Sequence, residues 1–291
     1  AASSDKLEYE YFANRGIRIV APRLMLPAFE EMESDTITVN IKNAKDVVFD
    51  IRYNKDAKPA RWEAKQVCYK DANPDISQFL IYSLEESTLR KADDSNRTYP
   101  LGLHGEGLFP YLKNLAQRTD GIAIFDEIKE NLKILDWFDD MQVPSGQLSS
   151  EFNLKLKDSY LSETLNTFDQ STNEGFLYLL FYLTLIISDE TPQFFAIENI
   201  DTAFNPKLCR EVTRRLIDLA KKHNKQIIAT THNAAVLDGM NLYDDDIRLH
   251  VVRRTIDGYT KTNRVVLKGE MSMPLSEAWQ KGFIGGLPDN F

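Results

Sequence analysis

The sequence predicts an α/β fold in which a parallel sheet is accompanied by an antiparallel β segment and a helical insertion. Two observations carry this prediction. Between residues 171 and 268, short apolar strands alternate with helical stretches, which is typical of a parallel sheet covered by helices. Between residues 36 and 53, apolar and polar side chains alternate with period two around turn-forming residues, which indicates an antiparallel hairpin.

The chain is expected to consist of four consecutive parts. They are an antiparallel β-rich part (1–75), a mainly helical insertion (76–162), a core lobe with the parallel sheet (163–268) and a C-terminal tail (269–291). Strands are expected at 36–41 and 47–53 in the first part, and residues 6–12 also have the composition of a strand.

The insertion should contain a short strand at 79–82 and a helix with Pro110 in its first turn. Apolar residues at helical spacing predict a second helix over 123–138. Residues 152–156 follow as a strand-like stretch.

In the core lobe, residues 176–187 are almost wholly apolar and predict a helix that is buried on most sides. Two buried strands are expected at 193–197 and 225–230, with a helix from Pro206 to about Lys222 between them. Residues 247–253 and 262–267 flank an Asp-Gly pair and predict a hairpin.

Composition narrows the class of protein. The 291 residues are 43% apolar and 27% charged, as in an ordinary globular protein, and the formal net charge is −9. This acidic balance disfavours non-specific nucleic-acid binding, although it does not exclude a local basic patch. The two cysteines lie far apart, and we find no signal peptide or membrane-spanning run, so we expect a cytoplasmic protein without membrane contact.

The strongest chemical motif is the apolar stretch 194–197 followed by Glu198 and Asn199. A carboxylate at the carboxyl end of a parallel strand lies at the edge of the sheet where ligands bind, and there it can hold Mg²⁺ beside nucleotide phosphates. The alternative interpretation is an ordinary strand that leads into a capped helix.

A second motif places His232 after the next buried strand. Because one helix and one strand separate it from Glu198, both side chains should lie at the same edge of the sheet. There the imidazole can contact a γ-phosphate or orient a water, although a lone histidine at such a position is more often structural.

A third motif, Ser171 to Gly175, opens the apolar helix. Ser171, Asn173 and the free N–H groups of the helix start can form an anion site. Simple N-capping by Ser171 or Asn173 explains the same residues.

Taken together, the three motifs resemble ATP-binding-cassette ATPases, in the branch of RecF, SMC and OLD-like proteins that includes bacterial "AAA family" members. The resemblance identifies Glu198 and Asn199 as the Walker B pair and His232 as the switch histidine. The signature motif would be Ser171, Thr172, Asn173, Glu174 and Gly175. The D-loop would be Thr202 to Asn205, with Asp201 before it as a further cofactor-binding residue. Segments 100–108 and 275–291 extend the resemblance.

The resemblance implies ATP and Mg²⁺ as cofactors and Glu198 as the metal ligand. It also implies a homodimer or higher homo-oligomer in which each ATP lies between one protomer's Walker loops and the other's signature segment. Members of this group often serve in anti-phage defence. We therefore expect an ATPase whose ATP-dependent dimerisation drives DNA repair or defence, with an effector protein as a further partner.

Two departures from the family pattern affect this expectation. The sequence has no G-x-x-x-x-G-K-[ST] loop to cradle the β-phosphate, which a missing N-terminal portion would explain. In addition, Glu198 stands where the family has aspartate, and Asn199 stands where it has the catalytic glutamate. Because an amide cannot act as a general base, a nucleotide-stabilised scaffold or sensor with little turnover remains an alternative. A nucleic-acid-binding repair module is the other.

Overall fold

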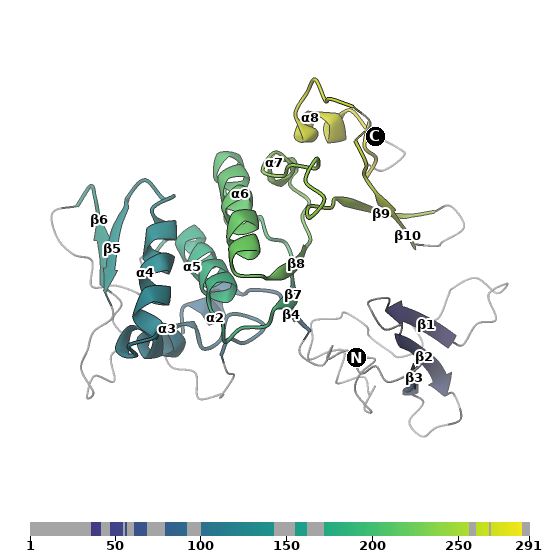
Figure 1. Ribbon diagram of the computed structural model, residues 1–291, viewed down its shortest axis with the longest axis horizontal. Helices are drawn as coiled ribbons and strands as arrows, with labels where there is room; N and C mark the ends of the chain where they lie inside the picture. Colours follow the sequence, from purple (N-terminus) through teal and green to yellow (C-terminus); the bar gives the residue numbers. More distant parts are fainter. Residues whose placement is uncertain are drawn as a thin grey trace. The chain divides into compact units, whose positions relative to one another are not determined.

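The computed structural model describes most of the chain from Leu80 onward and only strand segments before it. The described residues are 36–41, 47–54, 56, 61–68, 79–91, 100–142, 155–161, 172–255, 260–267 and 269–286. They belong to two compact units, 1–79 and 80–291 (Figure 1). The four-part division expected from the sequence stays a prediction.

The first unit contains an antiparallel sheet of three strands, β1 (Thr36–Ile41), β2 (Val47–Asn54) and β3 (Arg61–Cys68). Their spatial order is β1-β2-β3, with Ile41 opposite Val47 and Val47 opposite Cys68. The two strands predicted here are confirmed, and β3 is a third one. The strand expected at 6–12 lies outside the described residues.

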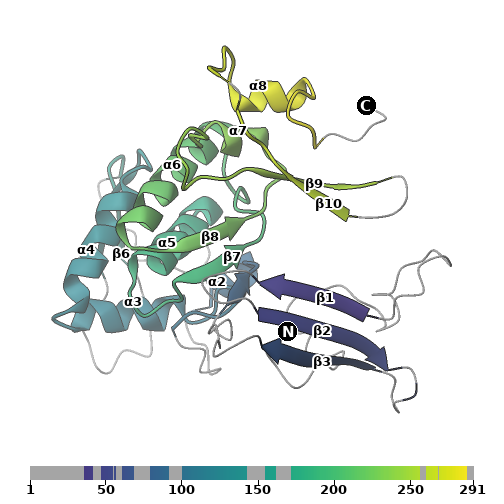
Figure 2. The ribbon, with the colours of Figure 1, turned by 45° about the vertical axis from the view of Figure 1, so that its right-hand side comes forward.

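The second unit is built on a parallel sheet with the order β4-β7-β8, formed by β4 (Leu80–Tyr82), β7 (Phe194–Ile197) and β8 (Gln226–Ala229). The parallel α/β core predicted from the sequence is confirmed. β4 lies in the range expected for the helical insertion, yet it pairs along β7. Figure 2 shows β7 and β8 side by side.

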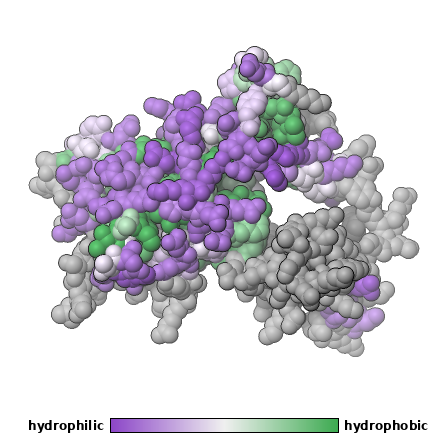
Figure 3. Space-filling model, in the orientation of Figure 1, coloured by the Kyte–Doolittle hydropathy of each residue, from purple (hydrophilic) through white to green (hydrophobic). Residues whose placement is uncertain are grey.

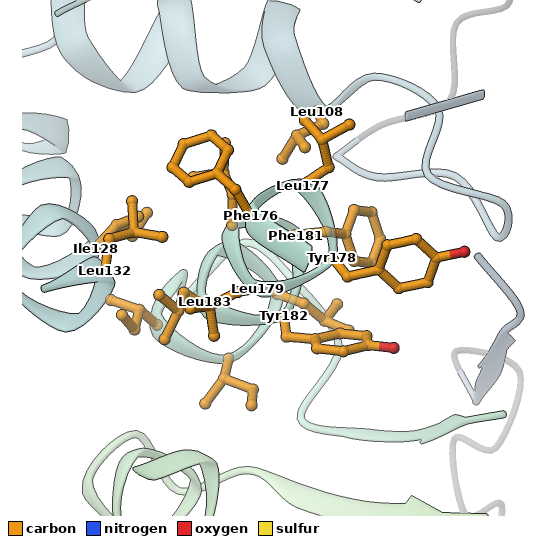
Figure 4. Packing of buried hydrophobic residues seen from close by; sticks show 14 of the residues in the cluster. Leu108, Ile128, Leu132, Phe176, Leu177, Tyr178, Leu179, Phe181, Tyr182 and Leu183 are labelled. Atoms are coloured by element: carbon orange, nitrogen blue, oxygen red, sulfur yellow. The ribbon is translucent and has the colours of Figure 1, made fainter. Parts of the chain in front are cut away.

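Helix α5 (Glu174–Ile187) fills the core behind one face of this sheet. Every residue from Gly175 to Ile187 is buried, as the uniformly apolar sequence predicts (Figure 4). The ring of Tyr82 on β4 meets Phe181 of α5 and Phe195 of β7 edge to face, at centroid distances of 5.7 and 5.8 Å. These aromatic contacts fix the helix against the sheet.

Helix α6 (Pro206–Lys222) has the start and the end that the sequence predicts. Asn205 is its N-cap, and the Oδ1 atom accepts a hydrogen bond from the N–H of Leu208 at 3.0 Å. The buried residues of α6 recur at helical spacing, and its charged side chains face outward, over the hydrophilic surface seen in Figure 3.

The prediction that 225–230 is a buried strand is wrong for β8 itself. Ile228 is 50% exposed, and Ile81, in the same row across the sheet, is 44% exposed. The reason is topological: among the described residues β8 is the last strand of its sheet, and helices cover only the face that carries Phe195 and Ile197.

The remaining described elements surround this core. They are α2 (Glu86–Leu89), α3 (Leu108–Gln117), α4 (Gly121–Leu132), β5 (Phe138–Gln142), β6 (Lys155–Asp158), α7 (Ala234–Leu237), β9 (His250–Arg254), β10 (Thr260–Arg264) and α8 (Leu275–Gln280). β5 pairs antiparallel with β6, and β9 pairs antiparallel with β10, which confirms the predicted C-terminal hairpin.

No helix in the described part of the chain has the length and apolar character needed to cross a bilayer.

The helix predicted over 123–138 is too long. α4 ends at Leu132, and Phe138 begins strand β5. Leu135 and Phe138 are nevertheless buried, because tight turns (Leu135 N to Leu132 O, Phe138 N to Leu135 O, both 3.0 Å) return them to the core. The helix prediction is thus confirmed up to Leu132, and beyond it the apolar spacing predicted burial correctly but helix incorrectly.

A buried lysine joins the end of α5 to the start of β8. The Lys225 ammonium donates to the carbonyl oxygens of Ser188 (2.8 Å) and Thr191 (2.9 Å) and to the Thr191 hydroxyl (2.9 Å). Ser188 is the C-cap of α5, so the cation also lies where the helix dipole favours positive charge. Burial lowers the pKa of this side chain to about 8.

We predict that Lys225→Met lowers the free energy of unfolding by about 2–4 kcal/mol, because it leaves buried carbonyl groups without a donor. Urea unfolding measures this, and Lys133→Met, which removes a surface ion pair with Glu130, should change it by less than about 1 kcal/mol.

The difference in stability between wild type and Lys225→Met should depend on pH. Between about pH 8 and the ordinary lysine pKa, the unfolded wild-type chain binds more protons than the folded one, so the wild-type advantage over Lys225→Met should widen as pH rises. An advantage that shrinks over this window would contradict the burial of the ammonium.

Candidate functional site

Two strand ends meet at the carboxyl edge of the parallel sheet. Ile197, the last residue of β7, pairs with Ala229, the last residue of β8, so Glu198 and His232 follow neighbouring strands at the same edge. The strands stay joined beyond their ends, since the N–H of Thr230 donates to the Ile197 carbonyl at 3.0 Å. This is the placement that the sequence predicts.

The two side chains are free to meet a ligand. Glu198 and His232 are exposed, and within the described part of the chain neither side chain forms a hydrogen bond or an ion pair. The backbone of Glu198 is held, because its N–H donates to the Tyr82 carbonyl at 2.8 Å. A fixed backbone thus carries an unengaged carboxylate.

The loop after β7 contains residues with positive φ angles, and hydrogen bonds fix its backbone. Asn199 has φ of +50° and Ala203 has φ of +69°. Asparagine tolerates this left-handed conformation, whereas in alanine it costs about 1–2 kcal/mol. The N–H of Asn199 donates to the Thr230 hydroxyl (2.9 Å), and the Thr202 hydroxyl donates to the Asn199 carbonyl (2.8 Å).

Asp201 ties this loop to the segment after β8. One carboxylate oxygen accepts a hydrogen bond from the Thr231 hydroxyl at 2.5 Å. The Thr231 hydroxyl oxygen also accepts from the N–H of Asn233 at 3.0 Å, next to His232. The position of the histidine therefore depends on the loop that carries Asn199.

The start of α5 lies against the same loop. A Cβ atom at Gly175 would lie 3.0 Å from the Ala203 carbonyl oxygen, which is tighter than most such contacts, so glycine favours this close approach. Asn173 caps the helix by accepting from the Gly175 N–H at 2.7 Å, and Glu174 lies in the first turn, where a negative charge is favourable. Ser171 lies outside the described residues.

Capping accounts for the contacts of Asn173 and Asn205, which are the roles that the alternative interpretation gave them. The structure thus brings Glu198, Asn199, Asp201 and His232 together around two loops, with Gly175 against the far end of the first. Whether these residues bind or act on a nucleotide stays a prediction.

Sequence reasoning missed several residues that hold the site. Arg90 donates to the Thr172 carbonyl at 3.0 Å and to Glu86, and so fixes the chain just before α5. The carbonyl of Tyr82 and the hydroxyls of Thr230 and Thr231 were not assigned roles either. Of these residues, only Thr230 and Thr231 could have been found from the sequence, because two hydroxyl side chains follow a predicted strand.

The donor set fits part of a magnesium-nucleotide site. Mg²⁺ is usually bound through one or two carboxylates, with waters and phosphates as the other ligands, and the Glu198 carboxylate meets this need. The described residues contain no group of three or more His, Cys, Asp or Glu that could hold a metal ion alone. The sequence also lacks the glycine-rich loop that would cradle the phosphates.

Comparisons with known proteins show the family and the fold of the chain. Residues 75–238, more than half of the chain, match the family model described as "AAA domain, putative AbiEii toxin, Type IV TA system". No curated protein matches the sequence.

Among solved structures, the chain is similar to an SMC head bound to the C-winged helix domain of ScpA, with a TM-score of 0.51 and 12% identity over 88% of this chain and 82% of that one. It also matches the SMC head domain from Thermotoga maritima, with a TM-score of 0.43 and 11% identity over 81% and 76% of the two chains. The first similarity supports a shared fold. The chain therefore belongs to this AAA-domain family and has the fold of SMC-type head ATPase domains.

Proposed function

We propose that this chain forms the Walker B, signature and switch part of an ATP-binding and ATP-hydrolysing protein, whose ATP-dependent dimerisation drives DNA repair or defence against phage. The observation that carries the proposal is the parallel pairing of β7 with β8, which ends in an exposed Glu198 beside the segment of His232. Membership of an AAA-domain family supports nucleotide use.

In this proposal each residue at the sheet edge has one task. Glu198 holds Mg²⁺ directly or through a water, and His232 contacts the γ-phosphate or orients the attacking water. The Asp201–Thr231 hydrogen bond keeps the two loops in register. When bound, the metal would neutralise charge that develops on the phosphates.

Dimerisation follows from the resemblance to ATP-binding-cassette ATPases, in which each ATP lies between the Walker loops of one protomer and the signature segment of the other. The free N–H groups at the start of α5 would form the signature side of such a site. Ser171, Asn173 and Gly175 would then face the partner's γ-phosphate. The Gly175–Ala203 contact supports this role, because it would couple that helix start to the loop beside Glu198.

A scaffold or sensor with slow turnover is the second candidate, and Asn199 favours it. Asn199 is the second residue after the end of β7, at the position where the resemblance implies a general base, but an amide cannot accept a proton. Nucleotide binding would then fix an oligomer, and hydrolysis would be slow.

We predict that the 291-residue chain alone has no measurable affinity for Mg·ATP, because nothing in it wraps the β-phosphate. Isothermal titration calorimetry measures this, and a longer form that carries a phosphate loop is the positive control. Micromolar binding by the chain alone would reveal an unrecognised phosphate site in it. That result would overturn the proposal that the phosphate loop lies outside these 291 residues.

We predict that Asn199→Glu raises ATP turnover by about ten-fold or more in a longer form with a phosphate loop, because it supplies the missing base. Steady-state phosphate release measures this. Asn224→Glu is a matched control, since Asn224 has nearly the same backbone conformation, with φ of +53°, at the end of α6. Fast turnover of the wild type would reject the scaffold, and an unchanged rate in Asn199→Glu would reject the assignment of Asn199.

A further inference from the structure

The hairpin of β9 and β10 concentrates positive charge in an acidic protein. We call the described residues 248–254 and 260–264 the basic ribbon. The ribbon has exposed basic side chains at Arg248, His250, Arg253, Arg254, Lys261 and Arg264, and its described residues include no aspartate or glutamate. The chain as a whole has a net charge of −9.

The pairing of the two strands places two positive charges opposite each other. Arg253 is directly opposite Lys261, whereas Arg264 is opposite His250, which is counted as neutral at pH 7. Like-charged residues at opposed positions destabilise a two-stranded sheet. Arg248 and these four residues form no ion pair with any described residue, so the repulsion is not offset within the part of the chain that the structure covers.

The other two-stranded ribbon of the same unit is built differently. In the hairpin of β5 and β6, Lys157 pairs with Asp139 at 2.5 Å, and the adjacent Asp140 pairs with Lys129 at 2.9 Å. The chain thus balances charge in one ribbon and leaves it unbalanced in the other. An anionic partner would remove the repulsion in the basic ribbon.

We propose that the basic ribbon binds the phosphate backbone of duplex nucleic acid. A two-stranded antiparallel ribbon has the width that the major groove of duplex DNA admits, and its basic side chains can contact phosphates from there.

The acidic net charge does not oppose this proposal at physiological salt. The Debye length is then about 8 Å, so a phosphate on the ribbon is influenced mainly by the nearest charges. In Figure 2 the ribbon extends away from the helices of its unit, and its basic side chains are exposed. The interaction does not depend on ATP and is separate from the candidate nucleotide site.

The test is fluorescence anisotropy with a labelled 30-base-pair DNA duplex, without nucleotide, over a series of salt concentrations. Wild type should bind with an affinity that falls steeply with salt. The double variant Arg253→Glu and Lys261→Glu should bind about ten-fold more weakly or worse, and the log–log salt slope should fall by about 2. The control Lys155→Glu and Lys157→Glu changes the net charge equally on the balanced ribbon and should bind within about two-fold of wild type.

A single variant separates binding from folding. Arg253→Glu turns the repulsive pair with Lys261 into an attractive one, so the thermal midpoint should stay level or rise while DNA affinity falls. A merely structural role for Arg253 would instead move both together.

Four outcomes would overturn the proposal: no duplex binding by wild type at low salt, unchanged binding by the double variant, an equal loss in the control, or tighter binding to a single strand or to phosphatidylserine vesicles than to the duplex. None of these outcomes bears on the proposed ATPase, whose tests use turnover and nucleotide affinity.

Discussion

The candidate site depends on one interaction, the parallel pairing of β7 between β4 and β8. Hydrogen bonds continue this pairing past the strand ends, from the N–H of Glu198 to Tyr82 and from the N–H of Thr230 to Ile197. They bring three segments that are far apart in the sequence to one edge. Without this pairing, Glu198 and His232 would belong to unrelated loops.

Helix α5 gives this edge its rigidity. It is buried along its whole length after Glu174, and its hydroxyl groups at Tyr178 and Tyr182 point the same way in Figure 4. Its first turn lies close to the loop that contains Ala203. This residue has a left-handed backbone conformation that alanine rarely adopts. The packing of α5 therefore stabilises a strained backbone conformation in the loop that follows Glu198.

Charge is distributed unevenly over the second unit. Lysines on α4, α6 and β6 pair with nearby carboxylates, as Lys222 does with Glu127 and Lys157 with Asp139. Lys225 is paired only with neutral oxygens and acts as a structural cation inside the fold. The basic ribbon is different again, since its basic side chains are exposed and Arg253 lies opposite Lys261.

The sequence by itself determined the local elements, because their causes are local. Asn205 and Pro206 set the start of α6 through one capping bond and one fixed φ angle, and the wholly apolar run after Gly175 required a buried helix. The order of strand, carboxylate, helix, strand and histidine also predicted the shared edge of the sheet.

Tertiary structure decided what depends on partners distant in the chain. The sequence marked 79–82 as a strand but could not show that it pairs with β7, because parallel pairing joins residues more than a hundred positions apart. It could not show that Ile228 is exposed, since an apolar strand reads the same at the edge of a sheet as at its centre. The bond between Thr231 and Asp201 and the opposition of Arg253 and Lys261 likewise exist only once the chain has folded, because both are set by register in space.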